Sequence, residues 1–232
     1  MRFPLFTFAL CLSMIAKAQD SCLIQLMVAP MEQEESIPKN VIDMLEDRLI
    51  YAINSVDNMS ASKDYGQFFI SGKIVNIENE LLDTKIVART TVMLYMGDVK
   101  RKSIMSCESF ELSGIANSEG SALLSSIYNS KSDRKFRTFV MAGREKIIEY
   151  FDKNYKQYID SALIAEAKGC YEEALYYLTM IPSKCIGYTE AKKASDRIIR
   201  KCDTQKSAAT IGKEWNRKQQ RLRPTIDFIK YK

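Results

Sequence analysis

The sequence contains no histidine in 232 residues. Catalysis by an imidazole-activated serine or cysteine, imidazole proton shuttles and histidine-ligated metal sites are therefore excluded. Glycine and proline are scarce, at 9 and 5 residues, and the glycine-rich patterns that cradle phosphates do not occur. No Cys-x-x-Cys pair supports a zinc ribbon or a thioredoxin-type site. We expect no cofactor and no metal, although carboxylate, lysine or tyrosine chemistry stays open.

Long hydrophobic runs are also missing, since no stretch approaches the ~20 apolar residues that a membrane-spanning helix needs. The N-terminus has Arg2, an apolar run at residues 3–15 and the small-residue pattern Ala16-Lys17-Ala18. This arrangement is typical of a secretory signal that is cleaved before Gln19. Residues 1–18 are therefore predicted to be a signal peptide, and the remaining chain is predicted to be exported.

Charge is distributed unevenly along the chain. Residues 19–132 contain 10 basic and 16 acidic side chains, whereas residues 133–232 contain 22 basic and 13 acidic ones. The hydrophobic pattern changes at the same place, from mixed strand and helix signals to helical signals alone. We therefore predict two units, with a boundary between residues 132 and 133.

The first unit is predicted to be an α+β domain. Compact or alternating apolar runs predict strands, at residues 22–29, 68–77, 85–95 and 103–112. Apolar residues at three- and four-residue spacing predict a helix after Pro38 and another at residues 121–128, capped near Ser118. Gly97-Asp98 is predicted to begin a hairpin turn, and residues 54–67 read as polar and turn-rich. The order of elements favours an antiparallel or mixed sheet with helices on one face.

The second unit is predicted to be an all-α helical hairpin extension with a basic C-terminal helix. Apolar periodicity and stop signals place its helices, at residues 136–168, 171–180, 188–201 and 205–222. Within residues 157–202, Gly169, Tyr171, Ala174 and Pro182 resemble the turn and second helix of a tetratricopeptide repeat. The match covers about one repeat and lacks the first-helix signature, so a generic helical bundle is the alternative.

The first unit resembles the periplasmic domain shared by curli secretion-channel proteins and outer-membrane activators of penicillin-binding proteins. The resemblance rests on the strand at residues 23–30, Phe69-Ile70-Ser71-Gly72-Lys73-Ile74, the following hairpin and the helix at residues 118–128, within residues 22–130. It implies a location in the periplasm or at the periplasmic face of the outer membrane. Both families are commonly lipoproteins, but Cys22 lacks the preceding residues of a lipoprotein cleavage site. Pore formation and enzyme activation are not carried over.

Five cysteines remain after the predicted cleavage. Cys170 and Cys202 lie at the same end of two predicted antiparallel helices, so they are a candidate disulfide. Cys185 lies at the other end. Cys22 and Cys107 lie on predicted strands of one sheet and could be neighbours. The alternative is that all five are reduced, buried and hydrophobic in role.

The candidate partner contacts are aromatic and arginine side chains of the second unit, the residue types that dominate interface hot spots. They are Tyr171, Tyr176, Tyr177, Trp215, Arg217 and Arg221. The same aromatics could instead belong to a core, and the basic stripe around Trp215 could be a solvated face. Three acids, Glu32, Glu34 and Glu35, could carry out acid–base chemistry but read as a solvated loop.

These features predict an exported, non-catalytic adaptor or scaffold that binds another periplasmic or outer-membrane protein and no nucleic acid. Peripheral association with the outer membrane or cell wall and formation of an oligomer are compatible with this interpretation. One alternative is a subunit of an outer-membrane secretion assembly, which ring-sized particles would favour. The other is a carboxylate-based enzyme or carbohydrate-binding protein, which a deep pocket with carboxyl groups of raised pKa would favour.

Overall fold

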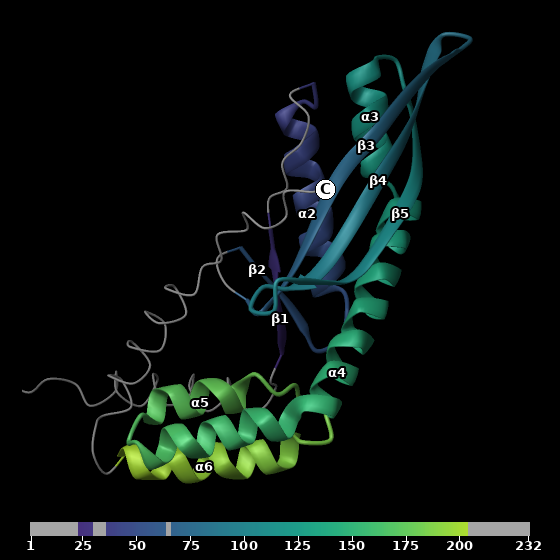
Figure 1. The fold of residues 1–232 in the computed structure, drawn as a ribbon. Helices are drawn as coiled ribbons and strands as arrows, with labels where there is room; N and C mark the ends of the chain where they lie inside the picture. The colour runs from purple at the N-terminus through teal and green to yellow at the C-terminus, as the bar shows by residue number, and fades with distance from the viewer. Residues whose placement is uncertain (1–22, 30–35, 64–65, 204–232) are drawn as a thin grey trace, which may run out of the picture. The chain divides into compact units, whose positions relative to one another are not determined.

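Five strands and five helices make up the part of the chain that the computed structural model describes, which comprises residues 23–29, 36–63 and 66–203. Their contacts divide this part into two units (Figure 1). Residues 25–147 form what we call the sheet unit, and residues 148–203, with Leu23 and Ile24, form the helical unit. The fold is α+β, as predicted.

The strands form one mixed sheet with the order β2-β1-β3-β4-β5. They span Ile24–Val28 (β1), Met59–Ser62 (β2), Phe68–Leu82 (β3), Lys85–Asp98 (β4) and Ser103–Ala116 (β5). β1 runs parallel to β3 because a helix and β2 lie between them in the chain. The long strands β3, β4 and β5 pair antiparallel and are joined by short turns.

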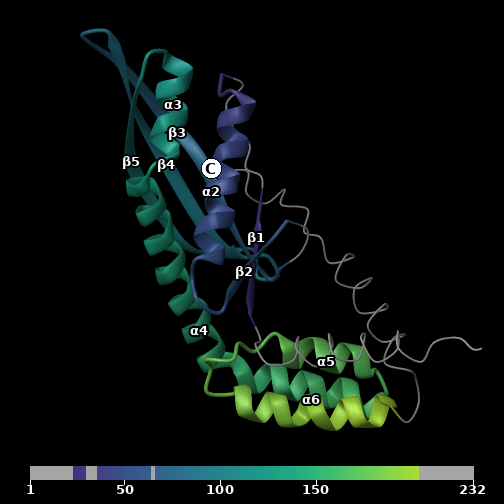
Figure 2. The same cartoon turned by 180° about the vertical axis from the view of Figure 1, so that it is seen from behind.

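Helices cover one face of this sheet (Figure 2). The helices of the sheet unit are α2 (Lys39–Asn54), α3 (Glu119–Ile127) and the first part of α4 (Ser130–Ala167). Gly114 on β5 lets α3 approach closely, because a Cβ atom there would lie 2.3 Å from the carbonyl oxygen of Ala122. Met96 on β4 lies against Gly143 of α4. The ladder register places Gly114 and Met96 on the same face, which confirms the predicted one-sided packing.

Two local features differ from the predictions. Gly97 and Asp98 are the last residues of β4 rather than the start of a turn, and the turn follows at residues 99–102. The side chain of Asp98 is buried and accepts a hydrogen bond from the backbone N–H of Arg101, which stabilises that turn. The segment predicted to be turn-rich contains β2, a four-residue edge strand. Its sequence, MSAS, is too short and polar to produce an alternating pattern.

The helical unit contains the second part of α4, α5 (Tyr171–Thr179) and α6 (Tyr188–Asp203). Gly169 ends α4 with a φ of 71°, a conformation that glycine adopts without steric cost. The backbone N–H groups of Gly169 and Cys170 donate to the carbonyls of Glu166 and Ala165, which is a Schellman cap. Small buried residues, Ala165 and Ala174 among them, contribute to the core of this unit. In the described ranges, no helix is both long and apolar enough to cross a membrane.

The boundary between the units differs from the predicted one. Contacts place it between Ile147 and Ile148, inside the continuous helix α4, and not between residues 132 and 133. The reason is aromatic packing against β5. The ring centroid of Phe110 lies 6.3 Å from that of Phe136 and 6.1 Å from that of Phe139. The start of α4 is therefore part of the sheet unit. The predicted signal peptide and the predicted helix at residues 205–222 lie outside the described residues.

Candidate functional site: a tyrosine and arginine patch

Helix α2 positions the first half of the candidate site. Val41, Leu45 and Leu49 are buried, so they form the inner face of the helix. Arg48 and Tyr51 are three residues apart and therefore lie next to each other on the helix surface. Tyr51 is 56% exposed, whereas the Arg48 side chain is only 21% exposed.

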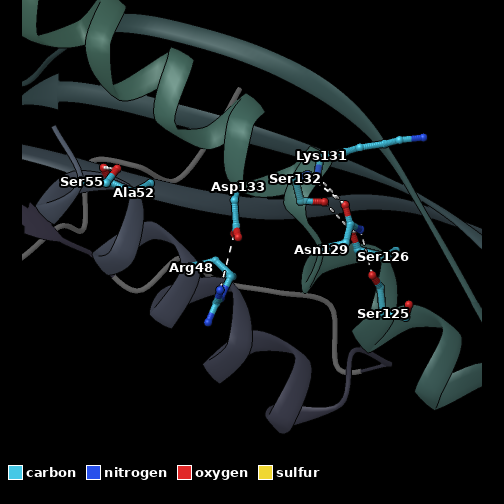
Figure 3. Close-up of polar contacts among 9 residues, drawn as sticks. All are labelled: Arg48, Ala52, Ser55, Ser125, Ser126, Asn129, Lys131, Ser132 and Asp133. Carbon is cyan, nitrogen blue, oxygen red and sulfur yellow. Dashed lines mark hydrogen bonds and ion pairs between the residues drawn. The ribbon is translucent and has the colours of Figure 1, made fainter.

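The junction between α3 and α4 positions the second half (Figure 3). The side-chain amide of Asn129 donates to the carbonyls of Ser125 and Ser126, at 2.9 and 2.8 Å. Its Oδ1 atom accepts the backbone N–H groups of Lys131 and Ser132, both at 3.0 Å. Asn129 therefore ends one helix and caps the next with a single side chain.

Buried hydroxyl groups attach this junction to the sheet. Ser126 Oγ donates to the carbonyl of Leu123 at 2.7 Å and lies 2.8 Å from Thr90 Oγ1. Since the Ser126 proton is used, Thr90 is the donor of the second hydrogen bond. Ser132 Oγ donates to the carbonyl of Ser126 at 2.7 Å. All three hydroxyl residues are at most 1% exposed, so the junction is rigidly supported.

Together these elements form what we call the Tyr/Arg patch, composed of Arg48, Tyr51, Tyr128 and Asp133. The guanidinium carbon of Arg48 lies 4.4 Å from the ring centroid of Tyr128 and 5.4 Å from that of Tyr51. Both distances are within the range of cation–π interactions. Tyr128 is 56% exposed, as is Tyr51, so both rings are accessible beside a mostly covered guanidinium.

The polar atoms of the patch are incompletely satisfied. Nη1 of Arg48 lies 3.6 Å from Oδ1 of Asp133, an ion pair that is longer than a hydrogen bond (Figure 3). Nε of Arg48 and Oδ1 of Asp133 are buried atoms without a hydrogen-bond partner. The patch thus combines a planar cation, two aromatic faces and an unused donor.

The tyrosines predicted as partner contacts lie together on α5. Tyr171, Tyr176 and Tyr177 are all half-buried. The ring centroids of Tyr176 and Tyr177 are 5.7 Å apart, and Tyr177 Oη donates to Glu173 at 3.4 Å. Burial and the nearby Glu173 carboxylate raise the pKa of Tyr177. The remaining predicted contacts, Trp215, Arg217 and Arg221, lie outside the described residues.

The described cysteines have different environments. Cys170 and Cys107 are exposed free thiols, whereas Cys185 is a buried one. Burial first, and then the carboxylate of Asp152, raise the pKa of Cys185 to about 12. The side chain of Cys202 lies outside the described residues, so the predicted Cys170–Cys202 disulfide stays a prediction. Cys107 lies on β5, which two strands separate from β1. Cys22 lies outside the described residues, so its proximity to Cys107 stays a prediction.

Candidate metal or acid–base groups are sparse in the described ranges. No group of three or more Cys, Asp or Glu side chains is placed to hold a metal ion there. Burial raises the pKa of Glu46 above its ordinary value. Lys63 lowers this pKa, whereas the nearby Asp43 and Asp47 carboxylates raise it further. The predicted acidic cluster Glu32, Glu34 and Glu35 lies outside the described residues.

The sequence interpretation missed the Tyr/Arg patch. The sequence did contain a signal for Arg48 and Tyr51. They are three residues apart, at the margin of the apolar stripe of a predicted helix. Tyr128 was predicted only as the end of a helix. Its position over Arg48 depends on how α2 and α3 share one face of the sheet, which no local pattern encodes.

Comparison with known proteins yields similarity of structure alone. No family model and no curated protein matches the chain. A minor lipoprotein from Acinetobacter baumannii is 17% identical, covers 52% of this chain and 94% of its own, and has a TM-score of 0.35. PelC from Paraburkholderia phytofirmans, solved as a dodecamer, is 14% identical over 49% of this chain and 87% of its own, with a TM-score of 0.35. A lipoprotein from Neisseria meningitidis is 9% identical over 52% and 96%, with a TM-score of 0.25. Function is therefore inferred from the chain's own residues.

Proposed function

We propose that this protein is an exported, non-catalytic adaptor of the bacterial envelope, which binds another periplasmic or outer-membrane protein through the Tyr/Arg patch. Export is supported by the basic residue, apolar run and small-residue pattern of residues 1–18. The binding role is supported chiefly by one observation, the proximity of the Arg48 guanidinium to the exposed rings of both Tyr51 and Tyr128.

The residue types of the patch are those that contribute most to protein interfaces. Tyrosine and arginine are enriched among hot spots because they bury a large area and lose little conformational entropy. Here the two sides of the patch are also held in place before a partner arrives. Asn129 fixes the end of α3 from which Tyr128 projects, and Ser132 fixes the start of α4 that carries Asp133. A preorganised surface loses less entropy on binding.

Site-specific photo-crosslinking in the producing cell can test the proposal. A photoreactive phenylalanine analogue replaces Tyr128 in one version of the chain and Leu82 in the other. Leu82 is a suitable control because it is 56% exposed, like Tyr128, and lies at the far end of β3. We expect the version at residue 128 to capture a defined exported protein, which mass spectrometry can identify.

Adding Arg48→Ala to the version with the photoreactive side chain at residue 128 separates binding from proximity. Capture at residue 128 is expected to fall by about tenfold in this variant, since a hot-spot arginine contributes more than about 1.4 kcal/mol. Equal capture from residue 82, or unchanged capture in Arg48→Ala, would contradict the assignment of this surface.

A further inference from the structure

We infer that the outer side of the first turns of α4 docks on an anionic phospholipid surface. This inference goes beyond the proposed function and shares with it the predicted export of the chain. The surface, which we call the basic face of α4, consists of Lys131, Arg134 and Arg137, with Thr138 and Met141 beside them. All five side chains are exposed.

The helix period places the three cations together on one side of α4. Phe136 and Phe139 are at most 1% exposed, so they mark the inner side of the helix. Lys131, Arg134 and Arg137 follow one another at three-residue spacing and are therefore neighbours on the outer side. Figure 3 shows the Lys131 side chain extending away from the junction between α3 and α4. The basic face is thus open to a partner along its length.

No acidic side chain neutralises these cations within the part of the chain that the structure describes. The side chains of Lys131, Arg134 and Arg137 form no hydrogen bond or ion pair there. The acidic residue of the first turn of α4, Asp133, is directed to Arg48 instead. The positive charge of the basic face is therefore left for a partner from outside.

The position of the cations is unfavourable for the helix itself. The first turn of a helix is the positive end of its dipole, so a cation such as Lys131 is disfavoured there, and cations at three-residue spacing repel each other. In contrast, Arg200 and Lys201 lie in the last turn of α6, where the dipole favours cations. A charge arrangement that opposes local stability indicates a role in binding, here with a partner of negative charge.

The composition of the basic face selects among anionic partners. Protein interfaces depend on aromatic and other apolar anchors at their centre, whereas the apolar member of this face is Met141, at 41% exposure. An anionic phospholipid surface attracts cations by charge alone, with a gain of roughly fivefold in binding for each Lys or Arg. Because the chain is predicted to be exported, it meets phospholipid headgroups and not nucleic acids.

Sedimentation of the exported chain with lipid vesicles tests the inference. One set of vesicles contains phosphatidylglycerol and phosphatidylcholine in equal amounts, and the other contains phosphatidylcholine alone. We expect saturable binding to the first set at about 150 mM salt and none to the second. Equal binding to both sets, or binding to neither, would overturn the inference. Hexaglutamate that bound as tightly as the anionic vesicles would also overturn it, in favour of an acidic protein.

Matched variants separate the basic face from net charge. The double variant Arg134→Gln and Arg137→Gln should bind anionic vesicles at least about tenfold more weakly. The double variant Lys193→Gln and Arg200→Gln removes the same charge from α6 and should leave binding nearly unchanged. All four side chains are exposed, so both variants should stay folded, which thermal melting checks. Equal losses in the two variants, or no loss in the first, would overturn the inference.

The proposed function is tested independently of this inference. Neither double variant changes a residue of the Tyr/Arg patch, so crosslinking at residue 128 should persist in both. Crosslinking without vesicle binding would overturn the docking on lipid and leave the proposed function standing. Vesicle binding through the basic face without crosslinking would do the reverse.

Discussion

Nη2 of Arg197 lies 2.6 Å from Oε2 of Glu166, which joins α6 to the last turn of α4 inside the helical unit. Lys201 donates to the other carboxylate oxygen at 2.7 Å. These hydrogen bonds from Arg197 and Lys201 hold the pKa of Glu166 below its ordinary value of 4.5. The Glu166 side chain is 9% exposed, but its two partners are about half exposed, at 48% and 52%.

The first prediction is that Glu166→Gln destabilises the helical unit by about 1 kcal/mol at neutral pH, a modest value because the cations are solvated. A carboxyl group with a lowered folded-state pKa stabilises the fold above its unfolded pKa and loses this effect as pH falls through the folded value. The difference between wild type and variant should therefore decrease as pH falls below 4.5, the ordinary value, and vanish only below the lowered pKa of the folded state. Chemical denaturation followed by circular dichroism measures it.

Glu149→Gln is the matched control for this prediction. Glu149 pairs with Lys153 on the same helix, but both side chains are well exposed, at 65% and 70%. We expect no measurable change in stability from it. An equal loss in both variants, or a Glu166 effect that does not decrease at all between about pH 7 and pH 3, would show that the pairing of Glu166 is not the cause.

The second prediction concerns the close approach of α3 and β5. A Cβ atom at Gly114 would lie 2.2 Å from the backbone nitrogen of Ser126 and 2.3 Å from the carbonyl oxygen of Ala122. Because these are backbone atoms, the helix itself must move, and Gly114→Ala should cost roughly 3 kcal/mol. Urea denaturation measures this loss.

Gly120 on the same helix provides the control. A Cβ atom there would meet nothing within 4 Å. Gly120→Ala should therefore leave the fold intact and add up to about 1 kcal/mol of stability through helix propensity. If the two substitutions had similar effects, the close packing at Gly114 would not be a determinant of the fold.

The third prediction is a difference in thiol reactivity. Only the thiolate reacts with maleimides, so a thiol with a pKa raised to about 12, as in buried Cys185, should react slowly near neutral pH. In the reduced chain, we expect Cys170 to react at least about 100-fold faster than Cys185. Cys107 should fall between them, because burial raises its pKa although it is exposed.

Peptide mapping after labelling measures each rate. Fast labelling of Cys185 in the folded chain would mean that the loop between α5 and α6 opens readily. The same mapping without prior reduction tests the predicted disulfide. A crosslinked peptide containing Cys170 and Cys202 would confirm it, whereas labelling of Cys170 at full stoichiometry in the exported protein would contradict it.

The sequence predicted the long elements because their apolar residues recur regularly. The helix after Pro38, the helix capped by Ser118 and the three long strands all correspond to elements of the structure. β2 was missed because four small or polar edge residues produce no pattern. The parallel pairing of β1 with β3 could not be predicted either. Periodicity indicates which face of a strand is buried, but it does not indicate which strand lies next to it.

The charge argument predicted two units but misplaced their boundary. The sheet unit, residues 25–147, has 15 basic and 17 acidic side chains, and residues 148–203 have nine of each. The basic excess belongs to residues 204–232, which have eight basic and two acidic side chains. The charge count over residues 133–232 combined this basic segment with the start of α4. Phe136 and Phe139 at the start of α4 pack on β5 and belong to the sheet unit. Packing of aromatic rings, and not charge, determines where the sheet unit ends.

The last prediction concerns the free edge of β5, which pairs only with β4 among the described strands. Two lysines of α4 donate to its backbone carbonyls, Lys135 to Glu111 at 2.5 Å and Lys146 to Met105 at 3.1 Å. Positive side chains along an edge oppose pairing with another chain. The double variant Lys135→Ala and Lys146→Ala should therefore self-associate more than wild type, with little change in stability.

Light scattering after gel filtration, over a range of concentrations, measures this difference. Lys153→Ala is the control, because Lys153 lies on the same helix but pairs with Glu149 and not with the sheet. We expect the apparent mass of the double variant to rise with concentration at least severalfold more steeply than that of either other protein. A double variant that matched wild type at all concentrations would show that the lysines do not protect this edge, and that the adjacent turn of α4 alone is sufficient.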